Sequence, residues 1–197
     1  MPTLKNVLQG SALCDKYIPD FEDLAKIVRQ LKEGGFKIAL TQGVYDMFHV
    51  GHGRYLAEGR SHGDVLIVGV DSDELTRSMK GKNRPFDVFD ERIEILAMLS
   101  SVSIITRRDL DQHKYDLIKL VQPDVLIMSK TTTSFSDEDK RLLNEHCGRI
   151  EHLEAKAATS TTAKMLRLMT EGAQGLASRI EATVREYFEH SNGGSNG

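Results

Sequence analysis

The chain of 197 residues has no tryptophan, only two cysteines and no apolar run longer than "VLIVGV" at 65–70. A run of that length is far too short to cross a bilayer. Cys14 and Cys147 lack CxxC spacing, which argues against both a disulfide framework and a zinc knuckle. The formal net charge of −3 gives no sign of a general binder of nucleic acid or of a membrane surface.

The N-terminal segment also lacks the features of a signal peptide. "MPTLKNVLQGSALC" contains one lysine and no long apolar core, so the expected location is the cytoplasm. The composition is ordinary, with 40% hydrophobic and 28% charged residues. The length suits one domain with a proper core and added terminal elements.

Apolar strand-like runs alternate with helix-like segments through most of the chain. The runs are apolar without alternation, as in a parallel sheet that is covered on both faces. We therefore expect an α/β fold: a Rossmann-like, doubly wound, parallel five-stranded sheet with helices on both faces, plus N- and C-terminal helices. Strands are predicted at 36–43, 64–71, 102–106, 124–128 and 149–153, and helices at 50–63, 87–100, 115–121 and 136–148.

Amphipathic segments at both ends lie outside this alternation. Residues 1–35 are predicted to be an N-terminal extension with a helix at 20–33. Residues 172–190 are predicted to be a separate C-terminal helix that follows a break at two glycines, and 191–197 a disordered tail. The stripe of the C-terminal helix either packs on its own domain or forms a dimer contact. Its members are Leu176, Ile180, Val184, Tyr187 and Phe188, and the two glycines are Gly172 and Gly175.

Two histidines, His49 and His52, follow the first predicted strand within "TQGVYDMFHVGHGRYL". In a doubly wound sheet, ligands bind beyond the carboxyl ends of the strands. A helix that begins near Val50 would place both imidazoles beside its first turn, where free N–H groups and the helix dipole favour phosphate. The alternatives are a pair of capping or core histidines and a metal pair. The metal interpretation is weaker, because metalloproteases need His at i and i+4 with an intervening Glu.

Other polar clusters follow the remaining strands. "MKGKNRP" at 79–85 carries three cations and is by itself typical of a solvated loop. Glu91 and Arg92 are an ordinary first-turn pair, and "STTAK" at 160–164 places hydroxyl groups at a helix start, which serves either as an N-cap or as a phosphate site.

The order of these motifs resembles the cytidylyltransferase-like nucleotidyltransferases that carry an HxGH motif. The resemblance runs from about residue 20 to residue 170, and we expect a nucleotidyltransferase domain at 36–171. It is nearest to the adenylyltransferases that act on heptose 1-phosphate, because of "GVDSD" and "KGKNRP". Glycerol-3-phosphate cytidylyltransferases and the choline- and ethanolamine-phosphate enzymes are similar too. The motifs in order are "TQGVYDMFHVGH", "GDVLIVGVDSD", "KGKNRPFDVFDER", "PDVLIM" and "STT".

The resemblance implies transfer of a nucleotidyl group from ATP or CTP, with Mg²⁺, to a small phosphorylated acceptor. A homodimer is expected from the stripe of the C-terminal helix. The resemblance also implies a role for each matching residue. The catalytic residues would be His49, His52 and Lys80. The nucleotide would contact Thr41, Gly43, Val44, Tyr45, Gly51, Asp71, Arg92, Ser160, Thr161 and Thr162. The acceptor would contact Lys82, Arg84, Arg108 and Lys130, with Arg107 as an alternative to Arg108. No resident metal ligands are implied.

The chain departs from these relatives after the fourth strand, where it has "MSKTT", and before the Ser-Thr pair, where it has "AKAAT". These departures concern the acceptor and the base, so ATP and CTP both stay open. Two rival interpretations use the same motifs. "HVGH" with "IMSKT" is similar to the signatures of class I aminoacyl-tRNA synthetases, although the chain has no room for an anticodon-binding domain. The other rival is a catalytically silent nucleotide-binding protein.

Overall fold

The computed structural model describes residues 3–10, 12–130, 136–154 and 161–192. The chain divides into two compact units, Met1–Ala157 and Ala158–Gly197, and each is described by itself. Among the described residues, no helix combines the length and the apolar character needed to cross a membrane.

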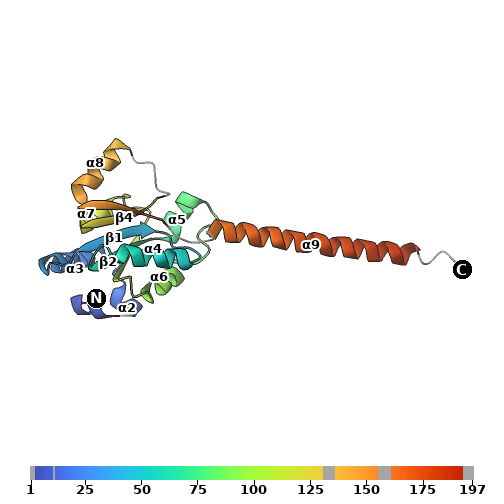
Figure 1. Cartoon of the computed structure of the whole chain (residues 1–197), viewed down its shortest axis with the longest axis horizontal. Coiled ribbons are helices and arrows are strands. Elements are labelled where there is room, and N and C mark those ends of the chain that lie inside the picture. Colours follow the sequence, from blue (N-terminus) through green and yellow to red (C-terminus); the bar gives the residue numbers. More distant parts are fainter. Residues whose placement is uncertain (1–2, 11, 131–135, 155–160, 193–197) are drawn as a thin grey trace. The chain divides into compact units, whose positions relative to one another are not determined.

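A five-stranded parallel sheet forms the centre of the first unit (Figure 1). Its strand order is β3-β2-β1-β4-β5, and every neighbouring pair is parallel. The predicted fold class is confirmed, and so is the existence of all five predicted strands. The strands are β1 Ile38–Gly43, β2 Val65–Asp71, β3 Ile104–Arg108, β4 Val125–Ser129 and β5 Arg149–Leu153.

Helices cover both faces of this sheet because its strands alternate their buried side chains between two cores. On one face, Leu40 and Ile67 pack with the apolar stripes of α1, α3, α7 and α8. On the other, Leu66 and Val68 pack mainly with α4 and α6. The helices of this unit are α1 Leu4–Gln9, α2 Leu13–Lys16, α3 Phe21–Glu33, α4 Val50–Arg60, α5 Asp73–Lys80, α6 Phe89–Ala97, α7 Asp116–Val121 and α8 Asp137–His146.

Hydrogen bonds tie the N-terminal segment to the sheet unit. The Lys16 ammonium donates to the carbonyl groups of Ala97 and Leu99, both at 2.8 Å, just where α6 ends. The Ile18 N–H donates to the Ile105 carbonyl at 2.8 Å, which extends the edge next to β3. The segment is therefore packed against the domain by buried contacts.

The sequence patterns missed three helices of this unit, α1, α2 and α5. Of these, α5 corrects the interpretation of "MKGKNRP" as a loop. Met79 and Lys80 are the last two residues of α5, and Gly81 ends the helix with a φ of 98°. The loop therefore starts at Gly81, and Lys80 sits at a helix C-terminus. Ser72 caps the other end of α5, where its hydroxyl accepts from the Leu75 N–H at 3.2 Å.

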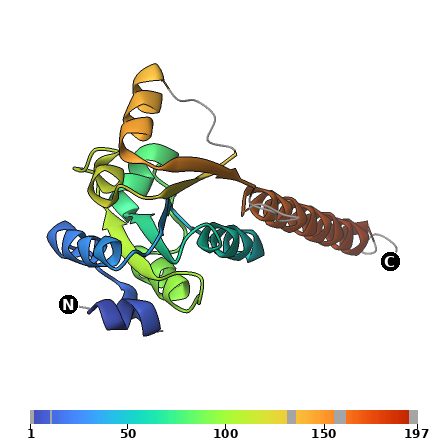
Figure 2. The same ribbon diagram turned by 60° about the vertical axis from the view of Figure 1, so that its left-hand side comes forward.

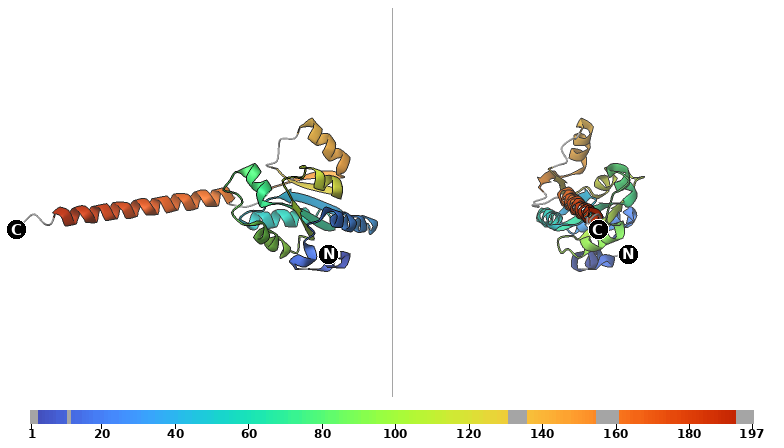
Figure 3. Two further views of the ribbon diagram at one scale, coloured as in Figure 1. Left: turned by 180° about the vertical axis from the view of Figure 1, so that it is seen from behind. Right: turned by 90° about the vertical axis from the view of Figure 1, so that its right-hand side faces the viewer.

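The second unit contains α9, a single helix of 32 residues, Thr161–Asn192 (Figures 2 and 3). The predicted break at Gly172 and Gly175 is wrong, since both glycines lie inside α9. A glycine inside a helix costs about 1 kcal/mol relative to alanine, which the helix-forming residues around it can offset. Of the predicted tail, Ser191 and Asn192 belong to α9, and 193–197 lie outside the described residues.

Candidate active site

The loop from Val44 to Phe48 carries the chain from the end of β1 to the start of α4. Tyr45 and Met47 have positive φ angles of 56° and 48°, a left-handed backbone that non-glycine residues rarely adopt. This backbone costs free energy and persists only where surrounding contacts hold it. The loop brings the two histidines to the sheet edge at which ligands of doubly wound folds bind.

His49 is the N-cap residue of α4. Its Nδ1 accepts a hydrogen bond from the Gly51 N–H at 3.0 Å. Because Nδ1 is the acceptor, the proton of the neutral imidazole is on Nε2. The capping interpretation of this histidine is therefore correct for its Nδ1 atom.

His52 lies in the first turn of α4, and its ring stacks on that of His49. The ring centroids are 4.1 Å apart with an interplanar angle of 20°. Burial, followed by the neighbouring charges of His49 and Lys80, lowers the pKa of His52 from 6.5 to about 4. The rings of Tyr45 and Phe48 flank the same imidazole at 5.8 and 5.4 Å. His52 is therefore neutral near pH 7, and its buried Nδ1 has no hydrogen-bond partner among the described residues.

The side chains of Thr41 and Tyr45 point into the protein. The Tyr45 hydroxyl donates to Thr41 Oγ1 at 3.4 Å, and the Tyr55 hydroxyl lies 3.1 Å from the same atom. Burial raises the pKa of the Tyr45 hydroxyl. These residues, with Gly43 and Val44 between them, can therefore offer a ligand only their backbone.

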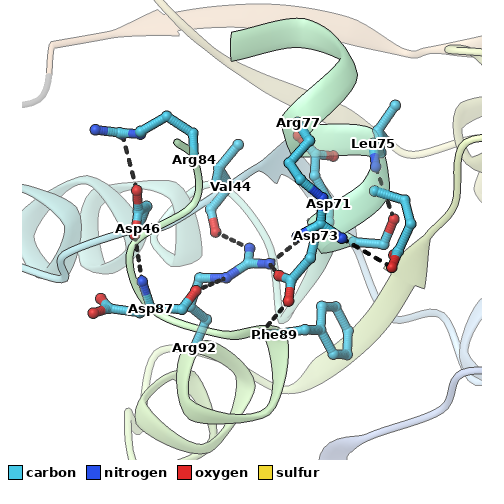
Figure 4. A network of polar contacts seen from close by, with 12 residues as sticks. Val44, Asp46, Asp71, Asp73, Leu75, Arg77, Arg84, Asp87, Phe89 and Arg92 are labelled. Carbon is cyan, nitrogen blue, oxygen red and sulfur yellow. Dashed lines mark hydrogen bonds and ion pairs between the residues drawn. The ribbon is translucent and has the colours of Figure 1, made fainter. Parts of the chain in front are cut away.

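Arg92 is fully buried, with its guanidinium at the centre of a network of protein acceptors (Figure 4). It donates to the carbonyl groups of Val44, Asp71 and Asp87, and it forms a 2.7 Å ion pair with Asp73. These partners lie at the ends of β1 and β2, at the start of α5 and before α6. The predicted direct contact of Arg92 with nucleotide has no support in this geometry, because the side chain is 0% exposed.

Asp71 and Arg108 form a close ion pair at the ends of neighbouring strands β2 and β3. Asp71 Oδ1 lies 2.6 Å from an Arg108 guanidinium nitrogen. Burial raises the pKa of Asp71, against the opposing effect of Arg108 and Lys80. Lys80 is exposed and acts on both Asp71 and His52, so its ammonium group lies within electrostatic reach of each.

The other predicted acceptor residues lie in different surroundings. Lys82 is exposed in the loop that follows α5. Arg84 pairs with Asp46 at 3.0 Å, and Lys130 pairs with Glu154 at 2.8 Å between two exposed side chains. Arg107, the alternative to Arg108, is held by Asp109 at 2.7 Å and by Glu74.

The predicted phosphate motif "STT" belongs to the second unit. Ser160 lies outside the described residues, as do Lys156 and the rest of "AKAAT" and Thr131 and Thr132 of "MSKTT". Thr161 and Thr162 open α9, as predicted, and only their backbone is described. Their relation to the histidine pair therefore stays a prediction.

Three buried or half-buried acids of the site were missed by the sequence reasoning. They are Asp46, Asp73 and Asp87, and each accepts hydrogen bonds from backbone N–H groups near the strand ends. Asp46 stands inside the histidine motif itself, so its position next to a strand end was an available signal. No group of three or more His, Cys, Asp or Glu side chains in the described part of the chain is arranged to hold a metal ion.

Fold and site together define a doubly wound α/β protein with two stacked imidazoles at a helix N-terminus beyond the strand ends, a class that binds phosphate-bearing ligands there. The chain belongs to the cytidylyltransferase-like family, whose model matches residues 40–171. This membership indicates a nucleotidyltransferase, in agreement with the motif resemblance.

Curated relatives carry the name bifunctional protein HldE. The protein from Sulfurimonas denitrificans is 35% identical over 158 residues, which are 77% of this chain and 31% of that protein. The protein from Aliarcobacter butzleri is 42% identical over 113 residues, 57% of this chain and 24% of that protein. The chain therefore spans about a third or less of the length of these relatives.

Among solved structures, the lipopolysaccharide core biosynthesis protein from Thermoplasma volcanium is similar with a TM-score of 0.51 and 24% identity. The match covers 61% of this chain and 98% of that one. A pantoate-beta-alanine ligase from Francisella tularensis has a TM-score of 0.52 and 14% identity, covering 71% of this chain and 66% of that one. At these identities the similarity concerns the fold alone.

Proposed function

We propose that the chain joins the nucleoside monophosphate part of ATP to a small phosphorylated acceptor, a sugar 1-phosphate, and releases pyrophosphate. The observation that carries this proposal is the pair of stacked imidazoles at the start of α4, one capping the helix and one neutral and half-buried. The relatives named HldE and the resemblance to adenylyltransferases that act on heptose 1-phosphate support the choice of ATP and of a sugar phosphate.

The proposed chemical step is an in-line displacement at the α-phosphorus. An oxygen of the acceptor phosphate forms the new P–O bond, the bond to the bridging oxygen breaks, and the electron pair leaves on pyrophosphate. Two anions must meet, so catalysis consists of alignment and charge stabilisation. His49 and the neutral His52 can donate hydrogen bonds to phosphate oxygens, and Lys80 and the α4 N-terminus add positive potential.

In this proposal Mg²⁺ enters as part of the substrate, on the oxygens of the triphosphate, as it does in many phosphoryl-transfer sites. The nucleotide lies along the backbone from Thr41 to Tyr45 and over Gly51, near the Asp71 end of β2. Thr161 and Thr162 at the start of α9, together with Ser160, would bind the β- and γ-phosphates at a helix N-terminus.

The acceptor phosphate is proposed to bind among Lys82, Arg108 and Lys130. Lys82 is the exposed cation of the loop after α5. Arg108 and Lys130 already pair with Asp71 and Glu154, so an acceptor phosphate must compete with these carboxylates or share their cations. The Lys130 pair is exposed on both sides and therefore contributes little, which makes this exchange easy.

The proposal is tested with the four nucleoside triphosphates against sugar 1-phosphates, glycerol 3-phosphate and alcohol phosphates, each with Mg²⁺, by pyrophosphate release. His52→Ala should lose about 10²–10³ in kcat, by analogy with the removal of one oxyanion-hole donor. His62→Ala, a histidine beyond the opposite end of α4, is the matched control and should keep the rate.

Two results would redirect this assignment. Highest turnover with CTP and glycerol 3-phosphate would favour the cytidylyltransferase alternative, which the family description also suits. Calorimetric binding of a nucleoside triphosphate without pyrophosphate release on any acceptor would favour the catalytically silent alternative. A His52→Ala variant with normal kcat would refute the catalytic role of the histidine.

A homodimer through α9 is the proposed assembly. Apolar side chains of α9 recur at spacings of three, four and seven residues, as in the seam of a two-stranded coiled coil, and this stripe can pack against the same stripe of a second copy. Within their own unit these side chains are more than two-fifths exposed: Leu166, Met169, Leu176, Ile180 and Val184. Sedimentation should give a dimer for the chain and a monomer for Ile180→Glu; a monomeric parent chain would rule this out.

A further inference from the structure

Asp46 and Asp87 join the Val44–Phe48 loop to the loop that carries Arg84, each by accepting hydrogen bonds from the other loop. We call this arrangement the clasp. Asp46 Oδ1 accepts from the N–H groups of Phe86 and Asp87 at 2.9 and 3.0 Å. In return, Asp87 Oδ2 accepts from the Met47 N–H at 2.6 Å. Since Met47 is one of the two residues of the Val44–Phe48 loop with positive φ, the clasp holds the strained part of this loop.

Arg84 is the cation that forms an ion pair with the buried Asp46 carboxylate in the described part of the chain. The Asp46 side chain is 2% exposed, and Arg84 lies 3.0 Å from its Oδ2 (Figure 4). A carboxylate taken out of water needs an opposite charge close by, and removing that partner leaves the charge uncompensated. The Arg84 guanidinium also lies 4.8 Å above the Phe86 ring, and its side chain is only 22% exposed. Arg84 is thus held from two sides by the clasp.

We propose that Asp46 and Arg84 are positioning residues that hold the loop from Val44 to Phe48 in the backbone that presents His49 and His52. The sequence resemblance implied an acceptor-binding role for Arg84. The ion pair indicates instead that the charge of Arg84 compensates the buried carboxylate of Asp46. The inference rests on the proposed nucleotidyl transfer. It extends that proposal by separating the cation that shapes the site from the cations that bind the acceptor.

Steady-state kinetics of Arg84→Gln, Asp46→Asn and the double variant distinguish positioning from acceptor binding. If the pair positions the loop, either single variant should lower kcat by about 10²-fold, because a displacement of the catalytic groups by about 1 Å is enough for such a loss. The double variant should lose no more than the worse single one, since both changes break the same contact. The KM for the acceptor should stay within about twofold. Arg84→Lys keeps the charge and should recover part of kcat.

An acceptor-binding role of Arg84 predicts the opposite effects on kcat and on the KM for the acceptor. Arg84→Gln would then raise the acceptor KM with kcat kept, and Asp46→Asn would not reproduce that change; this outcome overturns the proposal. Arg149→Gln is the matched control, since Arg149 pairs with Glu151 at 3.6 Å where β5 begins, at the opposite edge of the sheet. If Asp46→Asn does not fold, the two Arg84 variants decide the question alone.

Amide hydrogen exchange gives a readout that does not depend on turnover. Arg84→Gln should speed the exchange of the Met47 and Gly51 N–H groups, which donate to Asp87 and to the capping His49. The Arg149→Gln control should leave both rates unchanged. Unchanged exchange in Arg84→Gln would refute the positioning role even if the enzyme activity is confirmed. Faster exchange in a chain without any turnover would keep the clasp and refute the proposed function.

Discussion

The half-buried imidazole of His52 predicts a loss of stability in mild acid. Its pKa falls from 6.5 to about 4 in the folded chain, first through burial and then through His49 and Lys80. Between these values the unfolded chain binds a proton that the folded chain does not, so unfolding is favoured as the pH falls. The effect is absent above about pH 7 and complete below about pH 4.

The magnitude follows from the size of the shift. At about 1.4 kcal/mol per pKa unit, the full shift is worth about 3.5 kcal/mol, and partial exposure of the ring reduces this to about 2 kcal/mol. Replacement of His52 by Gln removes the titration. We therefore expect the native chain to lose about 2 kcal/mol more unfolding free energy than His52→Gln between about pH 7 and about pH 4.5.

Urea denaturation at the two pH values measures this difference directly. Titrations of all other groups are common to the native and variant chains and cancel in the comparison. His62→Gln is the control and should behave as the native chain does. Equal acid losses in the native chain and in His52→Gln would refute the desolvated, neutral state of His52.

Two further predictions concern the groups that hold the site. His49→Ala should cost about 1 kcal/mol, because the Gly51 N–H loses its capping partner, whereas His49→Asn should restore the cap without restoring pyrophosphate release. Arg92→Met should lower the free energy of unfolding by about 3–5 kcal/mol, since Asp73 loses its partner and three backbone carbonyls lose a donor. Arg149→Met should stay within about 0.5 kcal/mol of the native chain. A change below about 1 kcal/mol for Arg92→Met would contradict the network.

Elements with a strong hydrophobic pattern could be predicted, and the polar helix α5 could not. Strand β2 is buried at every residue, and its almost entirely apolar sequence by itself indicates a buried strand. In α5, only Leu75 and Met79 are large and apolar, and Met79 is exposed. Periodicity is therefore weak there. Its capping signals were nevertheless present, with Ser72 before the first residue and Gly81 after the last.

The break predicted in α9 failed for the opposite reason. The prediction overestimated how strongly Gly172 and Gly175 disfavour a helix when they lie inside a long run of helix-forming residues. A local signal of about 1 kcal/mol per residue does not end a helix when its neighbours favour the helical state. A glycine ends a helix when its backbone adopts a turn conformation, as Gly81 does with a φ of 98°.

The sequence by itself determined the parallel sheet and the placement of two histidines at the start of α4, because these follow from runs of neighbouring residues. Only the tertiary structure decided which charges are already paired. Arg108 meets Asp71 because β3 lies beside β2, and Arg84 meets Asp46 because two loops far apart in sequence share a buried carboxylate. Such pairings depend on long-range proximity and burial, which no local pattern of residues encodes.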